Sequence, residues 1–190
     1  MARGARQKTI EFAKLCLRKH RETEMAQKRK EHLLALVEEG FQKAAWHGPN
    51  LRSALRGVSA AEAAWRPGKG RHNIWELTVH AAFWKYAVAR RLTGSKEHEF
   101  PEKGTNWFAR DEGMSKGEAE KKWKRDLALL GKTHKELRAA IGGLKEQELD
   151  RRCRGSRQMA MQNMVGIAMH DVYHAGQIQV LRKLYAGRGK

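Results

Sequence analysis

The spacing of apolar residues limits this chain to a helical fold. In four long segments, residues 33–45, 73–94, 115–141 and 159–185, apolar side chains recur every three or four positions, which is the spacing of one face of an α-helix. No segment alternates apolar and polar residues as a half-buried strand does. Alanine and leucine outnumber valine, isoleucine and threonine by 42 to 18, a balance that favours helices over strands. The sequence therefore predicts an all-α protein.

Four amphipathic segments joined by three connections predict a four-helix bundle. The first segment is interrupted at Gly48-Pro49 and resumes from Leu51 to Val58. Because proline removes a backbone donor, we expect a kinked helix or two abutting helices there. The connection over residues 95–114 is longer than an antiparallel helix pair needs. We expect this long connection to cover a site.

The chain divides into three regions. Residues 1–27 form a basic N-terminal extension that offers little apolar surface to a core, residues 28–186 form the bundle, and residues 187–190 form a basic tail. The 39 Lys and Arg against 21 Asp and Glu give a formal charge of +18. Most of this excess belongs to the bundle itself.

The composition excludes several classes of protein. The longest uninterrupted apolar stretch is five residues, far short of the roughly 18 that a membrane-spanning helix needs. The basic N-terminus lacks the small-residue cleavage site of a secretory signal. The two cysteines, Cys16 and Cys153, are far apart and predict neither a disulfide framework nor a cysteine-based zinc site. This pattern is typical of a protein of the reducing cytoplasm.

Three histidines lie on apolar stripes in a pattern that suits a metal ion. His170 and His174 are four residues apart on the last predicted helix, so both rings project from its apolar face. His80 lies between Leu77 and Trp84 on the stripe of the second long helix. Imidazoles buried without partners are costly, and a divalent ion that accepts a lone pair from each ring removes this cost. Three such ligands leave open coordination positions, as catalytic metals require.

The residues alone leave a second interpretation open, because a histidine in a helical core is more often hydrogen-bonded than metal-bound. His134 lies on the stripe of the third long helix with no partner nearby in the sequence. We interpret it as a hydrogen-bonded structural histidine or a polar group that lines a pocket. His20, His32, His72 and His98 lie in charged or loop segments and are expected to face solvent.

Two segments resemble signatures of the DinB-like superfamily of four-helix proteins. The segment HDVYHAGQIQVLR at residues 170–182 is similar to the C-terminal signature, and NIWELTVHAAFW at residues 73–84 is similar to the signature of the second helix. Residues 46–51 and 63–67 resemble segments of one branch. The resemblance covers residues 28–186 and implies an antiparallel four-helix bundle with a long second crossover.

The resemblance also implies a function. It predicts a divalent metal ion held by His80, His170 and His174, with zinc favoured and nickel or iron as alternatives. The family is related to thiol-dependent transferases and metal-dependent hydrolases. We therefore expect a metal-dependent enzyme, either a thiol-dependent S-transferase or isomerase or a hydrolase that uses metal-activated water. Its partners are a small-molecule substrate and, for a transferase, a low-molecular-weight thiol; a homodimer is a further expectation at family level.

Three further residues are candidates for catalytic or pocket roles. Asp171 follows His170 and either orients a ligand ring or lies at the surface. Tyr173 and Gln177 lie near the histidine face and are candidate polar pocket groups. Simple packing explains each of the three equally well. Trp84, one turn from His80, is expected to be a pocket wall or a core aromatic.

The basic charge supports a different class of function. Lys and Arg gather at residues 28–30, 121–125, 151–157 and 182–190, and such clusters attract nucleic acid by neutralising phosphates. These clusters are spread along the chain, with no helix-turn-helix, finger or stacking motif. The alternative prediction is a basic nucleic-acid-associated or interaction module whose metal is structural or absent. Nucleic acid is the less favoured partner.

Overall fold

The computed structural model describes residues 11, 14–15, 17–18, 28–95, 99–104, 106–110 and 113–188. Most of the predicted N-terminal extension, His20, His98 and the last two residues of the predicted basic tail lie outside this range. The described residues form helices joined by loops and contain no strand beyond one isolated bridge. The all-α prediction is confirmed.

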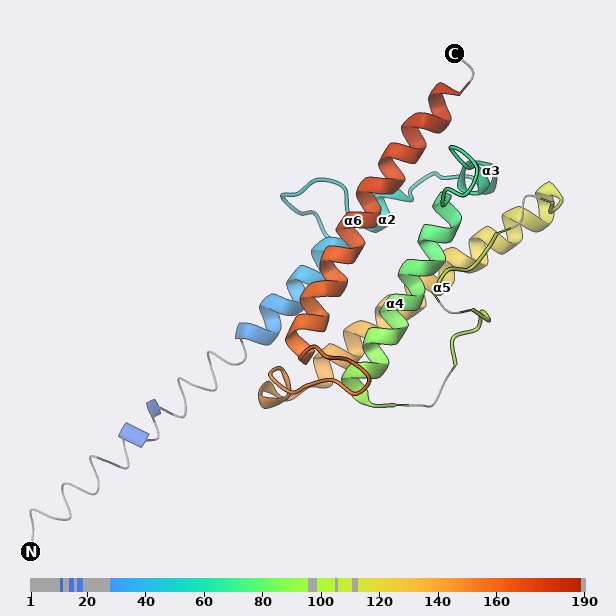
Figure 1. The fold of residues 1–190 in the computed structure, drawn as a ribbon. Helices are drawn as coiled ribbons and strands as arrows, with labels where there is room; N and C mark the ends of the chain where they lie inside the picture. The colour runs from blue at the N-terminus through green and yellow to red at the C-terminus, as the bar shows by residue number, and fades with distance from the viewer. Residues whose placement is uncertain are drawn as a thin grey trace, which may run out of the picture.

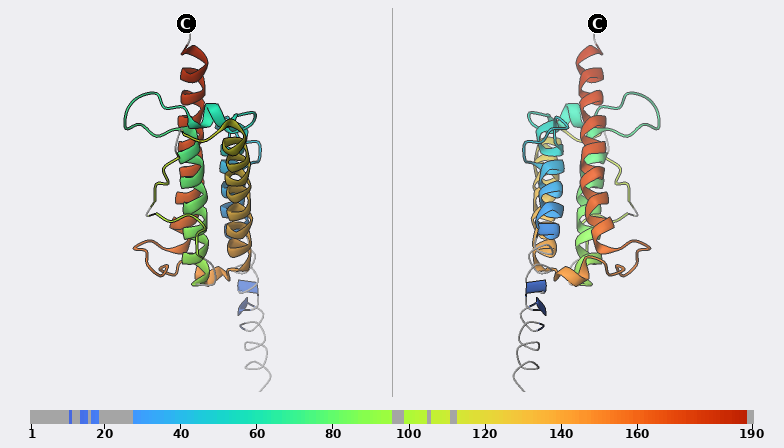
Figure 2. Two further views of the ribbon diagram at one scale, coloured as in Figure 1. Left: turned by 90° about the vertical axis from the view of Figure 1, so that its right-hand side faces the viewer. Right: turned by 90° about the vertical axis from the view of Figure 1, so that its left-hand side faces the viewer.

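Four long helices make up the bundle (Figure 1). They are the helix over residues 28–41, α4 (Ile74–Thr93), α5 (Lys116–Gly143) and α6 (Ala160–Gly187). Two short helices, α2 (Leu51–Ala54) and α3 (Ala60–Ala64), lie at one end. In the side views α4 and α6 form one layer, and α5 and the helix of residues 28–41 form the other (Figure 2). The two helices within each layer are antiparallel.

The connection from α4 to α5 is the predicted long crossover. The two helices run in the same direction, so the chain returns along the length of the bundle between them (Figure 1). The described part of this crossover is anchored in the core. Phe108 is buried, and Arg110 Nε donates to Asp126 Oδ2 of α5 at 3.0 Å. The indole of Trp75 on α4 donates to the same oxygen at 2.6 Å. These contacts hold the crossover against α4 and α5.

The start of the bundle differs from the prediction of a kinked or abutting helix. The first helix ends at Phe41, and a loop of residues 42–50 separates it from α2. Gly48 in this loop has a φ of 97°, a left-handed conformation that glycine adopts without strain. The amide of Asn50 donates to the Lys43 carbonyl at 2.8 Å, and its oxygen accepts from Ser53 N at 2.8 Å. Asn50 therefore closes the loop and caps α2.

Local signals set the ends of the longer helices. The side chain of Asn73 accepts from Glu76 N at 2.8 Å at the start of α4, and Gly94 ends that helix with a φ of 72°. A capping box of Ser115 and Glu118 opens α5. The helix ends at Gly143, the second of two consecutive glycines.

Two clusters of buried apolar side chains fill the bundle. One contains Trp75 and Trp123 and includes residues of α2 and α3. The other contains Leu137 and Met164 and lies around the opposite halves of the long helices. At Gly40 a β-carbon would lie 2.7 Å from the carbonyl oxygen of Ala168. Only glycine allows the first helix to approach α6 this closely.

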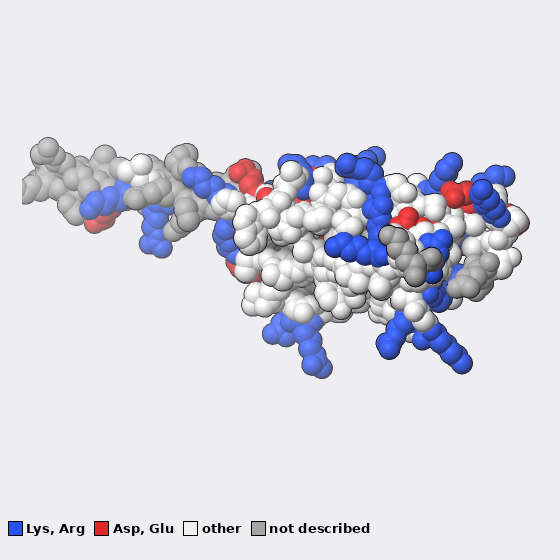
Figure 3. All heavy atoms as spheres, turned by 90° about the horizontal axis from the view of Figure 1, so that it is seen from above, with Lys and Arg blue, Asp and Glu red and all other residues white. Residues whose placement is uncertain are grey.

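On the face seen from above in Figure 3, the positive charge is spread over several places. Figure 3 shows Lys and Arg side chains standing out around the visible face, with uncharged surface between them. In the part of the chain that the structure describes, no helix combines the length and the apolar character needed to cross a membrane.

Candidate metal centre

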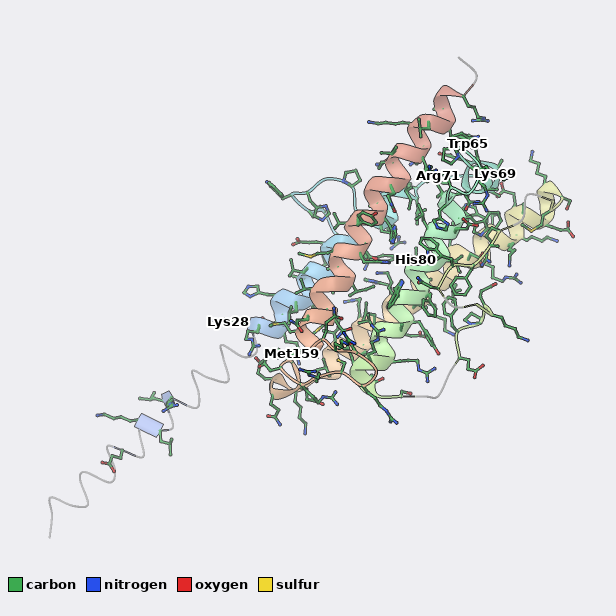
Figure 4. The ribbon with its side chains drawn as sticks, viewed as in Figure 1. Lys28, Trp65, Lys69, Arg71, His80 and Met159 are labelled. Atoms are coloured by element: carbon green, nitrogen blue, oxygen red, sulfur yellow. The ribbon has the colours of Figure 1, made fainter. Side chains whose placement is uncertain are left out.

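The structure brings His80, His170 and His174 together between α4 and α6. His80 lies in the first half of α4, on the side toward α6 (Figure 4). Its Nε2 atom lies 3.0 Å from His170 Nε2, and His174 Nε2 also lies 3.0 Å from His170 Nε2. Each ring thus offers one nitrogen to a common point, and these nitrogens all lie within 4.8 Å of one another. We call these three residues the histidine cluster.

Hydrogen bonds outside the histidine cluster fix two of its tautomers. His80 Nδ1 lies 3.0 Å from the carbonyl oxygen of Asn106, and His174 Nδ1 lies 2.6 Å from Oε1 of Gln177. An oxygen acceptor at Nδ1 requires the proton there, so Nε2 of each ring carries a lone pair. Both lone pairs face His170 Nε2, which can donate to only one of them. A cation at the common point satisfies all three nitrogens.

The spacing of the histidine cluster fits a divalent ion. Imidazole nitrogens about 2.0–2.1 Å from zinc lie about 2.9–3.4 Å apart at octahedral to tetrahedral angles. The two spacings of 3.0 Å fall within this range. Three neutral imidazoles suit zinc, nickel and ferrous iron alike. The donor set therefore fits a metal without selecting one.

The surroundings keep the three rings neutral. Burial lowers the pKa of His174 to about 4, although its hydrogen bond to Gln177 acts in the opposite direction. Burial and then the neighbouring histidines lower the pKa of His170 to about 3. Burial also lowers the pKa of His80. Because only a neutral imidazole binds a metal, the cluster is ready to act as a ligand set at neutral pH.

The crossover covers one side of the histidine cluster. The Trp107 ring stacks on His80 with centroids 3.9 Å apart, and on its other side it stacks on His72 at 3.7 Å. His72 Nδ1 also lies 3.0 Å from a carboxylate oxygen of Glu76. His72 is exposed, as expected, and its ring also stacks on Trp107 at the outer edge of the site. His32 is exposed as expected.

A small cavity opens beside the cluster at His170, which is less buried than its two partners. Its volume is about 150 Å³. Trp84 forms part of its wall, as expected. The polar lining consists of His170, one guanidinium and three amide side chains, those of Arg91, Gln158, Gln162 and Asn163. No carboxylate lines this cavity among the described residues.

The structure separates the three candidate catalytic residues. Gln177 contacts the cluster through His174. Tyr173 is 64% exposed, and its ring lies edge-on to His174 at 5.2 Å, on the outer face of α6. Asp171 is fully buried and pairs with Lys85, not with a histidine of the cluster. It is neither a surface residue nor a partner of a ligand ring.

Two buried pairs near the cluster were missed by sequence reasoning. Lys85 and Asp171 are both fully buried and bind each other between α4 and α6. Glu38 of the first helix lies 3.0 Å from His134 Nε2 on α5. His134 is thus hydrogen-bonded through Nε2 and also lines a pocket, so both of our interpretations of it apply. The burial of Lys85 could have been predicted from the sequence, because Lys85 lies on the apolar stripe of α4 between Ala81 and Val88.

Comparison with known families agrees with this architecture. The sequence model of the DinB superfamily matches residues 43–178, which span α2 to most of α6 and include the whole histidine cluster. Neither a search of curated proteins nor a search of solved structures found a match to the chain. The match covers well over half of the chain. The chain belongs to the DinB superfamily.

Proposed function

We propose that this chain is a metal-dependent enzyme in which His80, His170 and His174 hold one divalent ion, with zinc as the first candidate. The observation that carries the proposal is the pair of fixed tautomers, which aim two Nε2 lone pairs at the same point as His170 Nε2. Three protein ligands leave a coordination position for a reacting group. A metal bound there lowers the pKa of a thiol or a water molecule in that position.

Thiol transfer suits this site better than hydrolysis. A hydrolase that activates water gains from a carboxylate that accepts and returns the proton. The nearest buried carboxylates are engaged elsewhere, since Glu76 binds Arg66 and His72 while Asp171 binds Lys85. A thiol that loses its proton to solvent becomes a nucleophile without such a group. Arg91 supplies a positive charge at the cavity for a thiol that carries carboxylates, as glutathione and bacillithiol do.

Elemental analysis of protein purified without an affinity tag tests the metal. We expect about one equivalent of a divalent ion per chain, because the cluster offers a single ligand set. Zinc, nickel and iron are measured together, so the result also identifies the ion. Protein that contains no metal and takes none up from a zinc solution would refute the proposal.

Assays with alternative nucleophiles test the reaction. The metal-loaded protein is mixed with a simple electrophile and glutathione, bacillithiol or mycothiol, and thiol consumption is measured. We expect consumption that depends on the metal and that falls in the Arg91→Ala protein through a higher KM for the thiol. Ester hydrolysis without any thiol is measured in parallel. Metal-dependent hydrolysis in the absence of thiol consumption would assign the site to the hydrolase class instead.

We also propose that the enzyme works in the cytoplasm as a homodimer. A thiol cosubstrate requires a reducing compartment. Four apolar side chains are exposed along the outer face of α6, namely Met169, Tyr173, Val180 and Leu184. A continuous apolar stripe of this kind is typical of an interface. Sedimentation of the wild type and of Tyr173→Lys tests the dimer, and a wild-type monomer at all concentrations would contradict it.

A further inference from the structure

A second and larger cavity lies away from the histidine cluster. Its volume is about 1100 Å³, and its lining comes from the end of the first helix, the α2 region and α5. None of His80, His170 and His174 contributes to it. We call it the basic cavity because of the charges described below.

Two segments of the chain present positive charges to this cavity. Arg52 and Arg56 are four residues apart in the α2 region. From the opposite side, α5 presents Lys132, Lys135 and Arg138, spaced three residues apart along one helix face. Like charges around one cavity repel each other, and this repulsion costs stability unless an anion lies between them.

Few of these charges are neutralised within the chain. Glu136 is the only acidic residue in the described lining, and its carboxylate lies 3.8 Å from Lys132 Nζ. Arg138 binds Glu38 at 2.6 Å. In the described part of the chain, Arg56 and Lys135 form no ion pair. These two cations, one on each side, remain for a ligand.

A buried histidine is among the residues that line the basic cavity. His134 lines the cavity although it is only 2% exposed. Burial opposes ionisation of Glu38, but hydrogen bonds from Gln42 and His134 outweigh it and lower the Glu38 pKa. Burial and then the charge of Lys85 lower the pKa of His134 to about 4. Glu38 is thus a carboxylate and His134 is a neutral ring at neutral pH.

The Glu38–His134 pair leaves one ring nitrogen without a partner. A carboxylate only accepts hydrogen bonds, so the proton of His134 lies on Nε2, 3.0 Å from Glu38 Oε1. Nδ1 then carries a lone pair, and it has no hydrogen-bond partner among the described residues although it is buried. Such an atom is costly to bury unless a donor reaches it. A residue that lines the cavity therefore carries a buried acceptor without a donor, and the cations of the lining outnumber its one acidic residue.

We propose that the basic cavity is a second small-molecule site, separate from the metal centre, that binds a phosphate-bearing compound. The phosphate oxygens lie between Arg56 and Lys135, because a guanidinium matches the geometry of a phosphate and a lysine adds a point charge. A hydroxyl of the ligand or a protonated phosphate oxygen donates to His134 Nδ1. The volume of about 1100 Å³ leaves room for a ligand larger than a single phosphate.

Calorimetric titration with pyrophosphate tests this site. The titration is run in about 150 mM salt, where weak attraction to exposed surface charge is largely screened. We expect pyrophosphate to bind the wild type, and we expect the affinity of the Arg56→Ala/Lys135→Ala protein to fall by about tenfold or more, because two charged contacts are removed. Circular dichroism confirms that the double variant is folded.

Two control variants distinguish binding in the basic cavity from binding to surface charge or to the metal centre. Arg154→Ala/Arg157→Ala removes two exposed charges that do not line the basic cavity, so it should leave the affinity for pyrophosphate unchanged. His80→Ala removes a residue of the metal centre and should also leave it unchanged. Equal weakening in both double variants would show attraction to a basic surface only. Loss of binding in His80→Ala would place pyrophosphate at the metal centre, and no binding to the wild type at millimolar concentrations would also overturn the proposal.

Discussion

The histidine cluster and the Glu38–His134 pair are both built from imidazoles on apolar helix faces, but their ring nitrogens meet different partners. His134 directs Nε2 at a carboxylate 3.0 Å away. His80 and His174 direct Nε2 at another imidazole, while oxygen acceptors hold their Nδ1 protons. Burial is similar, since His80, His134 and His174 are all at most 5% exposed. The partner of the ring nitrogen, and not burial, separates a candidate metal ligand from a structural histidine.

Alanine substitution of single histidines gives the strongest test of this difference. His80→Ala, His170→Ala or His174→Ala leaves two ligands, which are too few for tight binding. We expect bound metal to fall from about one equivalent to a trace in each variant. His134→Ala should keep its metal, because that ring is engaged by Glu38. Unchanged stoichiometry in the His170→Ala and His174→Ala proteins would mean that the metal lies elsewhere.

Unlike the histidine cluster, Lys85 and Asp171 form a buried ion pair and are not candidate metal ligands. Burial lowers the pKa of Lys85 and raises that of Asp171, and in each case the charge of the other group opposes the shift. Lys85→Met should lower the free energy of unfolding by about 3–5 kcal/mol, because Asp171 then has no partner. Urea unfolding measures the change.

A matched double variant shows whether the loss comes from the unpaired carboxyl group. Lys85→Met/Asp171→Leu replaces both charges with apolar groups and should recover most of the lost stability. If the double variant were as unstable as Lys85→Met alone, packing defects rather than the broken pair would be the cause.

Acid should destabilise the metal-free protein through both the histidine cluster and the Glu38–His134 pair. The pKa values of His134 and His174 are about 4 in the folded state, against 6.5 for the free side chain. Between these values the unfolded chain binds protons that the folded chain does not, so stability falls as pH falls through this window. At about pH 5 the loss is about 2 kcal/mol for each of these two histidines. Urea unfolding at about pH 7.5 and pH 5 measures it.

Saturating zinc should sharpen the difference between the regions in the same experiment. Zinc keeps His174 neutral, so it adds stability at pH values above those at which this histidine takes up a proton. His134 binds no zinc and should respond to acid in the same way with or without it. His134→Phe should remove only the zinc-independent part of the pH dependence. A stability that does not change between the two pH values would contradict the assigned neutral rings.

The smallest expected effect concerns the hydrogen bond that orients His174. Gln177→Leu removes the acceptor at His174 Nδ1, and we expect zinc affinity to weaken by about tenfold. Gln179→Leu is the same change two residues further along α6 and should have no effect. Competition with a zinc-binding dye measures both affinities. Equal affinities in the two variants would show that packing alone orients the ring.

The helices and the members of the histidine cluster could be predicted because their signals are local. Asn73, Gly94 and the Ser115–Glu118 box act within one helical turn, and the spacing of His170 and His174 places both rings on one face. The loop of residues 42–50 was missed, because its closure by Asn50 depends on a hydrogen bond across the loop to Lys43. Lys85 was overlooked because a lysine on an apolar stripe has no visible partner until Asp171 lies beside it.

The sequence by itself determined the helices, their apolar faces and which histidines point inward, because these follow from a helical repeat and from contacts within about four residues. Only the tertiary structure decided how each histidine is used. The Asn106 carbonyl that orients His80 is 26 positions away in the chain, and Glu38 is 96 positions from His134. A ring nitrogen takes its role from the atom it faces, and in this chain the packing of separate helices and the crossover brings that atom into place.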